Sequence, residues 1–211
     1  AYTANWSSET MSVVDISDAA QPVQISALSL PGTAPQCINV VGRYAYICNW
    51  NAASMSVVDI SNPFLPRLVT STAVGANPRS IAVAGRFAYV ANRTDDNIAV
   101  MDISNPLAPI KVANVNVGSN PFSIYVSGRY AYVANNGDSN VSVVDISNPY
   151  APSQVSTVNV GFQPQSIFVS GRYAYTANFG QSTLSIIDVS NPAIPVQVAT
   201  TSVGTNPTSI F

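Results

Sequence analysis

The fold of this chain is decided by the stretch SIYVSGRYAYVANNGDSNVSVVDISNPYAPSQVSTVNV at residues 123–160. Apolar and polar residues alternate through SIYVS, YAYVAN and VSVVDIS, as they do in half-buried β-strands. Gly128-Arg129 reads as a two-residue turn with glycine first, which type II′ hairpins prefer. The prolines of NPYAP end the third strand. SQVSTVNV is a fourth strand, and its alternation shifts between Val155 and Val158, which predicts a β-bulge.

This unit of four antiparallel strands occurs five times along the chain. The VVDIS element and its variants recur at spacings of 44, 43, 43 and 43 residues, which places Asp15, Asp59, Asp102, Asp145 and Asp188 at equivalent positions. Four strands in each unit of this length are typical of a β-propeller, and the prolines and the alternation exclude a helical solenoid. We therefore expect residues 1–211 to form one all-β domain, a five-bladed β-propeller with about 43 residues per repeat.

The two ends of the chain fall within one repeat. TSIF at the C-terminus matches the innermost strand of the other units, and AYTAN at the N-terminus matches their second strand. We expect Ser209-Ile210-Phe211 to pair antiparallel with Tyr2-Thr3-Ala4 and to close the ring. In the alternative, the same C-terminal strand completes a neighbouring subunit by strand addition. A break at a hairpin also suggests a sequence taken from a longer chain.

The repeated elements resemble a known family. AYVAN followed by VSVVDISNPYAPSQVSTVNVG is similar to the LVIVD repeat, and more loosely to the YVTN repeat of surface-layer-type propellers, over essentially the whole chain. The resemblance implies a propeller at the cell surface or outside the cell, in families that often have no known biochemical activity. Some YVTN-like propellers are lactonases, but no matching constellation of residues is evident in this sequence.

Composition and charge exclude several classes of function. The net charge is −2 and only 9% of the residues are charged, so the chain lacks the basic footprint of a nucleic-acid-binding protein. No apolar run approaches the ~20 residues that a membrane-spanning helix needs. The chain has no histidine, which removes the usual partner of a nucleophile and the usual metal ligand. We therefore expect no metal, no cofactor, no membrane insertion and no enzymatic activity.

The charged residues that recur in the repeats are interpreted as architectural. Each repeated aspartate is expected to accept hydrogen bonds from the backbone of its own Ile-Ser-Asn-Pro turn. The turn arginines are expected to be solvated and to pair with an aspartate of the adjacent turn; they are Arg43, Arg86, Arg129 and Arg172. A calcium-binding ring of carboxylates and an anion-binding ring of arginines are the alternatives. The tyrosines that follow these arginines are expected to pack between blades.

Two cysteines replace the usual Ser and Ala in one repeat only. If Gly42-Arg43 is a two-residue turn, the register places Cys37 directly opposite Cys48 on the neighbouring strand. Cross-strand Cα atoms lie within the range that a disulfide can bridge. We therefore predict a disulfide between Cys37 and Cys48, which would agree with an oxidising, extracellular location; the alternative is two buried thiols.

The repeats differ most on one face of the expected propeller. The loops between second and third strands and the blade-to-blade connections lie together on this face, which we call the loop face. Six variable residues there form the predicted ligand site; they are Trp6, Trp50, Arg79, Arg93, Phe122 and Phe179. Exposed aromatic and arginine side chains on a rigid scaffold suit a glycan or a protein partner. The alternative is that these loops are simply unconstrained.

The sequence therefore favours a non-catalytic, adhesion-type module at the cell surface or outside the cell, which acts through its loop face. A hydrolase or lyase acting at the mouth of the central channel is the alternative from another class, and an acid pair converging there would favour it. A third possibility is a subunit of an extracellular assembly formed by strand addition. The opposite face carries apolar residues in its NPxxP turns, such as Phe64 and Tyr150, which allows self-association.

Overall fold

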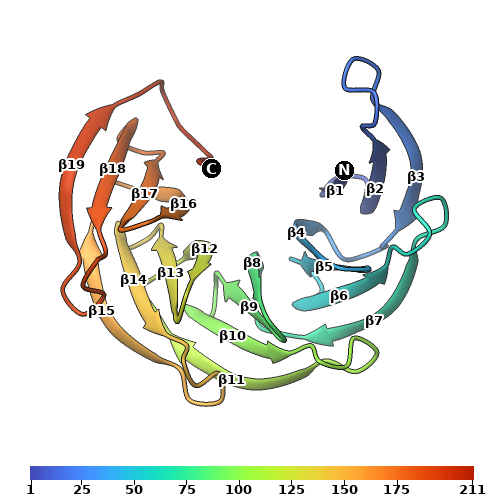
Figure 1. Cartoon of the computed structure of the whole chain (residues 1–211), viewed down its shortest axis with the longest axis horizontal. Coiled ribbons are helices and arrows are strands. Elements are labelled where there is room, and N and C mark those ends of the chain that lie inside the picture. Colours follow the sequence, from blue (N-terminus) through green and yellow to red (C-terminus); the bar gives the residue numbers. More distant parts are fainter.

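A computed structural model describes all 211 residues. It contains 19 strands, which form five antiparallel sheets. The sheets fan around a common axis like the blades of a propeller (Figure 1). Blade 1 has three strands, namely β1 (Tyr2–Asn5), β2 (Thr10–Asp15) and β3 (Val23–Ser29). Blade 2 consists of β4 (Pro35–Val41), β5 (Tyr44–Asn49), β6 (Ser54–Asp59) and β7 (Arg67–Ala73). The first two sheets thus follow the repeat pattern of the sequence.

The three remaining sheets each have four strands that pair in sequence order. Blade 3 consists of β8 (Pro78–Ala84), β9 (Phe87–Asn92), β10 (Asn97–Asp102) and β11 (Ile110–Asn116). Blade 4 consists of β12 (Pro121–Ser127), β13 (Tyr130–Asn135), β14 (Asn140–Asp145) and β15 (Ser153–Asn159). Blade 5 consists of β16 (Pro164–Ser170), β17 (Tyr173–Asn178), β18 (Thr183–Asp188) and β19 (Val196–Ser202). The all-β class is therefore confirmed, and no helix is present that could reach across a bilayer.

The turn and the bulge predicted within each unit are both present. Ser127 lies opposite Tyr130 across the two-residue turn. Gly128 has a φ of 58°, and Arg129 is not among the residues with positive φ, as the type II′ turn requires. Between β14 and β15, Val143 pairs with Ser156 and Val144 with Gln154, so Val155 is the extra residue of a bulge on the outermost strand.

The core lies between the blades. Side chains of successive residues in a strand point to opposite faces of the sheet, so each blade packs one apolar face on the blade before it and the other on the blade after it. Between blades 4 and 5, Tyr132 and Val143 pack against Ile167 and Ile187, all at most 3% exposed. Equivalent clusters fill the other three boundaries. The predicted packing of the repeated tyrosines between blades is thereby confirmed.

The repeated aspartates and arginines hold the turns on the face opposite the loop face. In every blade the aspartate accepts a hydrogen bond from the backbone N–H two residues later, as in the 2.8 Å bond from Ser147 to Asp145. In three blades the turn arginine pairs directly with this aspartate; the pairs are Arg43–Asp59, Arg129–Asp145 and Arg172–Asp188. The architectural interpretation of these residues is confirmed.

Stability should decrease in acid because of these three pairs. The arginine hydrogen bond and the Ser N–H lower the pKa of Asp59, Asp145 and Asp188 to about 2, from an ordinary value of 3.8. A carboxyl with a lowered pKa contributes stability that is complete above pH 3.8 and is lost as the pH falls through 2. We expect the melting temperature to fall over this window, and to fall less steeply in Asp145→Asn. Parallel curves for the two proteins would contradict this.

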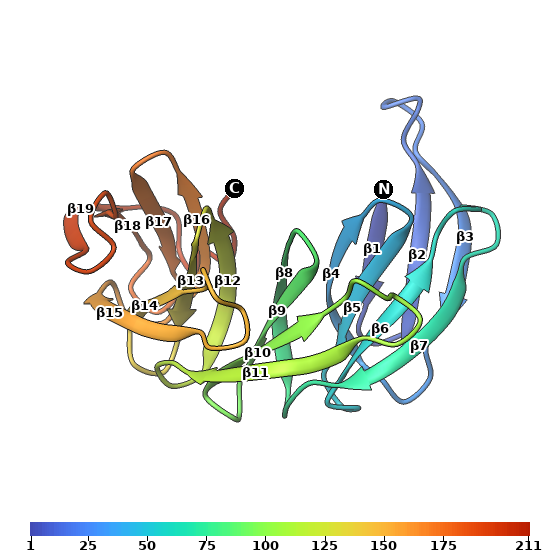
Figure 2. The ribbon, with the colours of Figure 1, turned by 60° about the horizontal axis from the view of Figure 1, so that its bottom comes forward.

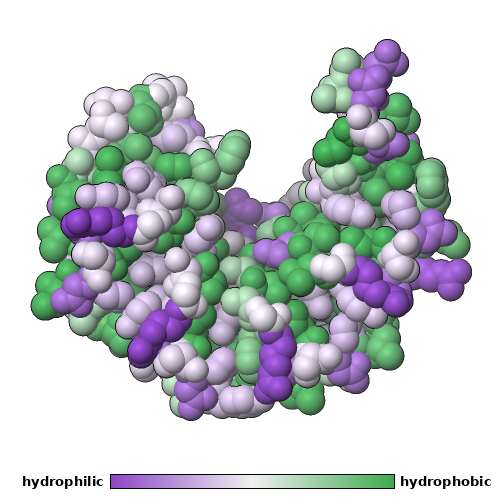
Figure 3. Space-filling model, viewed as in Figure 1, coloured by the Kyte–Doolittle hydropathy of each residue, from purple (hydrophilic) through white to green (hydrophobic).

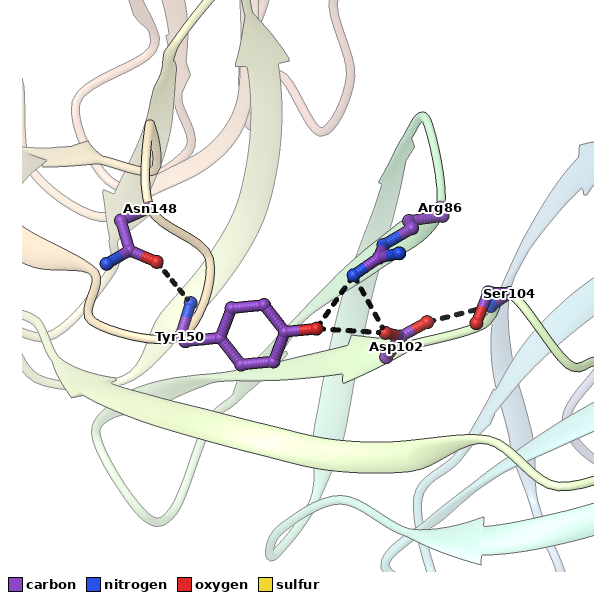
Figure 4. A network of polar contacts seen from close by, with 5 residues as sticks. All are labelled: Arg86, Asp102, Ser104, Asn148 and Tyr150. Carbon is purple, nitrogen blue, oxygen red and sulfur yellow. Dashed lines mark hydrogen bonds and ion pairs between the residues drawn. The ribbon is translucent and has the colours of Figure 1, made fainter.

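Blade 3 departs from the pattern, because a tyrosine of blade 4 enters its ion pair (Figure 4). The Tyr150 hydroxyl accepts a 2.7 Å hydrogen bond from Arg86 and donates one of 3.3 Å to Asp102, while Arg86 and Asp102 are 3.5 Å apart. The Tyr150 ring also meets the Phe87 ring edge-on, at 5.8 Å between centroids. Tyr150 therefore ties two blades together, a role that the sequence did not indicate.

The predicted ring closure is wrong. β1 pairs only with β2, no residue after Ser202 forms a strand, and the two ends of the chain lie on separate arms of an open arc (Figures 1 and 2). The space-filling view shows open space between these arms, and hydrophobic and hydrophilic residues interspersed over the face (Figure 3). The five blades form an arc whose two ends do not meet.

The C-terminal segment lies beside blade 5 because of a local contact that repeats around the arc. The Ile210 N–H donates a 3.2 Å hydrogen bond to Ser166 Oγ on β16. The same bond joins the innermost strands at two other boundaries, from Ile124 to Ser80 and from Ile167 to Ser123. Ile210 thus occupies the position of the next innermost strand after β16, and not a position beside β1.

Candidate functional site

In blades 2 to 5, the loop face is built from two kinds of segment that hydrogen-bond to each other. The residue that follows the second strand donates its N–H to the connection before the innermost strand, as Trp50 does to Ala34 and Arg93 to Asn77, both at 3.1 Å. These bonds join backbone atoms, so they form with any side chain. The backbone therefore presents one variable side chain per blade at this position without depending on its identity.

A second variable side chain in each of blades 2 to 5 comes from a bulge at the start of the innermost strand. The register moves from Pro78 opposite Asn92 to Ser80 opposite Ala91, so Arg79 is left without a partner in the ladder. Gln36, Phe122 and Gln165 occupy the same position in blades 2, 4 and 5. Bulges can change the direction in which a side chain points. Here each bulge leaves one side chain without a cross-strand partner at the start of an innermost strand.

The side chains from these two positions meet in one continuous group. Arg79 donates a hydrogen bond to the Gln36 side-chain oxygen, and its guanidinium carbon lies 4.3 Å from the centre of the Phe122 ring. The Arg93 guanidinium carbon lies 5.6 Å from the same ring and 5.5 Å from Trp50. The Trp50 ring lies 5.6 Å from that of Trp6. We call this group the loop-face cluster; its members are Trp6, Gln36, Trp50, Arg79, Arg93 and Phe122.

Five of the six residues predicted from the sequence for the ligand site thus belong to the loop-face cluster. Phe179 does not, because it lies on blade 5 and makes none of these aromatic or arginine contacts. Gln36, in contrast, was outside the predicted set although it differs between repeats. The signal that could have found it is its position at the bulge, which it shares with Arg79 and Phe122.

The two arginines of the cluster have no acidic partner. Every ion pair in the chain uses Arg43, Arg86, Arg129 or Arg172, on the opposite face. Arg79 and Arg93 are half-buried, and Nε of Arg93 is buried without any hydrogen-bond partner. Burial, together with the nearby positive charge of Arg93, lowers the pKa of Arg79. Two desolvated cations with unused donors favour the binding of an anion.

The acidic residues of the loop face are used to fasten loops. Asp95 accepts a 2.8 Å hydrogen bond from the Ala76 N–H, Asp96 one of 2.8 Å from Asn120, and Asp138 one of 2.9 Å from Ser119. Glu9 does the same for Gly32 at 2.7 Å. These carboxylates form no group with the geometry of a metal site, and each one holds the connection that precedes an innermost strand.

The cysteine pair lies next to the cluster. Cys37 and Cys48 are cross-strand partners in β4 and β5, so the predicted register is confirmed. Both are free cysteines in the structure, so the predicted disulfide is not present there. Burial, with a smaller effect of the neighbouring Cys37, raises the pKa of the Cys48 thiol. The two cysteines face each other between β4, which carries Gln36, and β5, which is followed by Trp50; these are the two cluster residues of blade 2.

The repeated unit of this chain matches the model of a known family. The model of the LVIVD repeat matches four segments, at residues 31–74, 75–117, 120–160 and 163–202. The chain belongs to the LVIVD repeat family. The four segments correspond to blades 2 to 5 of this LVIVD repeat protein, and the resemblance expected from the sequence is therefore confirmed. A search of curated protein sequences finds no match.

Solved structures share the fold over nearly the whole LVIVD repeat chain. A proposed 6-phosphogluconolactonase from Bacteroides fragilis is 15% identical with a TM-score of 0.87, over 99% of this chain and 68% of the other. A periplasmic gluconolactonase from Pseudomonas aeruginosa is 15% identical with a TM-score of 0.85, over 98% and 68%. A hydrazine synthase from Kuenenia stuttgartiensis is 26% identical with a TM-score of 0.66, over 83% and 51%.

These comparisons correct the function expected from the sequence. We expected a non-catalytic adhesion module and no enzymatic activity, but propellers that match this LVIVD repeat protein over 98–99% of its length bear the names of lactonases. The names fit the alternative better, which was a hydrolase or lyase acting at the mouth of the central channel. A likeness at 15% identity shows the shared fold, so the activity of this chain is a matter for proposal.

Proposed function

We propose that this protein is a hydrolase that acts at the loop-face cluster. Its substrate is the lactone of a sugar acid, and hydrolysis opens the lactone ring. The observation that supports it most is the pair of half-buried guanidiniums, Arg79 and Arg93, which no carboxylate neutralises. The names of the similar structures, which include a 6-phosphogluconolactonase and a gluconolactonase, suggest the class of substrate. A periplasmic neighbour also agrees with the extracellular location that we expect.

The cluster is preorganised to hold an anionic group. The Phe122 ring lies beside both guanidiniums and Gln36 holds one of them, so the two cations have fixed positions before a ligand arrives. Cation–π contact stabilises a desolvated guanidinium without using its N–H donors. The donors of Arg79 that Gln36 does not use, and those of Arg93, can therefore bind a phosphate, a carboxylate or the carbonyl oxygen of the lactone.

The reaction needs little more than charge stabilisation. Water adds to the lactone carbonyl carbon, negative charge develops on the carbonyl oxygen, and the bond from this carbon to the ring oxygen then breaks. The ring oxygen takes a proton and becomes a hydroxyl, while the new carboxylic acid releases a proton to solvent. Arg79 and Arg93 stabilise the developing charge, and one such donor is typically worth about 10²- to 10³-fold in rate. Because the chain has no histidine, we assign proton transfer to solvent.

Acid release measured at constant pH tests the proposal. D-Glucono-1,5-lactone and its 6-phosphate are added to the protein, and the spontaneous rate without protein is subtracted. We expect a protein-dependent rate that saturates with substrate and is inhibited by gluconate. A rate equal to the spontaneous one for both lactones, at all protein concentrations, would reject the hydrolase.

A further inference from the structure

Trp6 and Trp50 form a pair that the fold itself does not require. They are the only two tryptophans of the chain, and they occupy the same repeat position in blades 1 and 2. Blades 3, 4 and 5 have Arg93, Asn136 and Phe179 there, with equivalent backbone hydrogen bonds. The loop therefore forms equally well without an indole, and another reason is needed for two of them side by side.

The pair presents an apolar platform to solvent. Trp6 is 42% exposed, and its ring is tilted by 59° to that of Trp50 at a centroid distance of 5.6 Å. The exposed residues that follow the two tryptophans in the sequence carry no charge and include the polar residues Ser7, Ser8 and Asn51. An aromatic surface with neutral hydrogen-bonding groups at its rim matches a sugar ring, which has apolar C–H faces and hydroxyls at its edge.

The platform is continuous with the two arginines. Trp50 contacts Trp6 on one side and the Arg93 guanidinium on the other, at 5.6 and 5.5 Å. Each of these steps is about the length of one hexose ring. A ligand whose reacting sugar lies at Arg79 and Arg93 therefore places one additional ring over Trp50, where Trp6 is the neighbouring aromatic ring.

We propose that Trp6 and Trp50 form a second subsite that binds a glycosyl residue attached to the acidic sugar. The preferred ligands are then aldobionic acids, in which a sugar acid carries a second hexose, and the preferred substrates are their lactones. The assignment of the reacting ring rests on the proposed function, whereas the binding of the glycosyl ring depends only on the platform.

Tryptophan fluorescence tests this subsite directly, because both fluorophores of the chain lie in it. The probes are gluconate, lactobionate, which is gluconate carrying a galactosyl ring, and lactose, which has two rings but no acid. We expect lactobionate to bind about tenfold more tightly than gluconate, as one good ring contact allows. Lactose should bind more weakly than lactobionate because it lacks the carboxylate. Equal affinities for lactobionate and gluconate would overturn the proposal.

Two variants locate the effect. Trp6→Ala should remove the tenfold advantage of lactobionate by weakening lactobionate about tenfold more than gluconate, with Trp50 as the remaining fluorophore. Phe179→Ala changes the same repeat position in blade 5, outside the loop-face cluster, and should leave both affinities unchanged. If Trp6→Ala weakens both acids equally, or if Phe179→Ala removes the advantage, the subsite is wrong.

These outcomes separate the subsite from the hydrolase. Affinity is measured with acids that cannot turn over, so a lactobionate advantage that depends on Trp6 supports the subsite even if no lactone is hydrolysed. Hydrolysis of gluconolactone together with equal affinities for gluconate and lactobionate would retain the hydrolase and reject the subsite.

Discussion

Replacing Arg79 and Arg93 together by glutamine is expected to lower kcat/KM for lactone hydrolysis, and the affinity for gluconate, by about 10²- to 10⁴-fold. A hydrogen bond to a charged group contributes about 1.5–3 kcal/mol, and the proposal uses one from each arginine. No other cation shares the cluster, since the remaining half-buried contacts are aromatic rings and Gln36. Initial rates at constant pH and tryptophan fluorescence titration measure the two effects.

The fold should tolerate this double substitution. Arg79 and Arg93 repel each other and have no acidic partner, so their removal relieves this repulsion and offsets the loss of their contacts with Phe122, Trp50 and Gln36. We expect a melting temperature close to that of the unmodified protein. Arg129→Gln is the matched control, because it removes an arginine paired with Asp145 on the opposite face and should leave kcat/KM unchanged. If the double variant keeps the activity and the gluconate affinity of the unmodified protein, the site is wrongly placed.

The second large effect is expected from Asn135→Ala, which should lower the free energy of unfolding by about 2–4 kcal/mol. Asn135 is fully buried, and its side-chain N–H groups donate to Ser142 Oγ at 2.8 Å and Asn140 Oδ1 at 2.7 Å. Gly118 lies so close that a Cβ there would be 2.7 Å from this nitrogen. The backbone N–H of Gly118 donates a 3.3 Å hydrogen bond to Ser142 Oγ. The substitution leaves the fully buried Ser142 Oγ and the half-buried Asn140 Oδ1 with one hydrogen bond fewer, next to a cavity.

The neighbouring asparagine provides the control for this prediction. Asn136 is half-buried, and its side chain makes only a 3.4 Å contact with the Pro164 carbonyl oxygen. Asn136→Ala should change the free energy of unfolding by less than about 0.5 kcal/mol, as surface substitutions usually do. Urea unfolding of both variants measures the difference. Equal losses would mean that the buried network around Asn135 contributes little to stability.

Much of the local structure follows from single repeats. The two-residue turn at Gly128, the bulge at Val155 and the pairing of Cys37 with Cys48 were predicted from alternation and spacing, and the structure has all three. The hydrogen bond from Ser147 to Asp145 was predicted in the same way. Such features depend on residues close in sequence or on adjacent strands of one sheet, where hydrogen bonding leaves few registers.

The candidate site could be predicted only in part. Comparing repeats identified Trp6, Trp50, Arg79, Arg93 and Phe122 as variable residues on one face, but it also included Phe179 and left out Gln36. Position in a repeat says which face a side chain occupies, whereas contact depends on the bulge that turns Gln36 and Arg79 toward each other. Whether a carboxylate lies close enough to neutralise Arg79 and Arg93 likewise depends on how the loops pack together, which the sequence does not specify.

The sequence by itself determined the all-β class, the number of repeats, the strands, their turns and the family. The tertiary structure decided that the two ends of this chain do not pair, that Tyr150 of blade 4 enters the ion pair of blade 3, and that two unneutralised arginines lie against aromatic rings. The physical reason is that strand pairing is local and periodic, so one repeat already specifies it. The angle between blades, and the side chains that meet across it, result from the packing of whole sheets, to which many weak contacts contribute together.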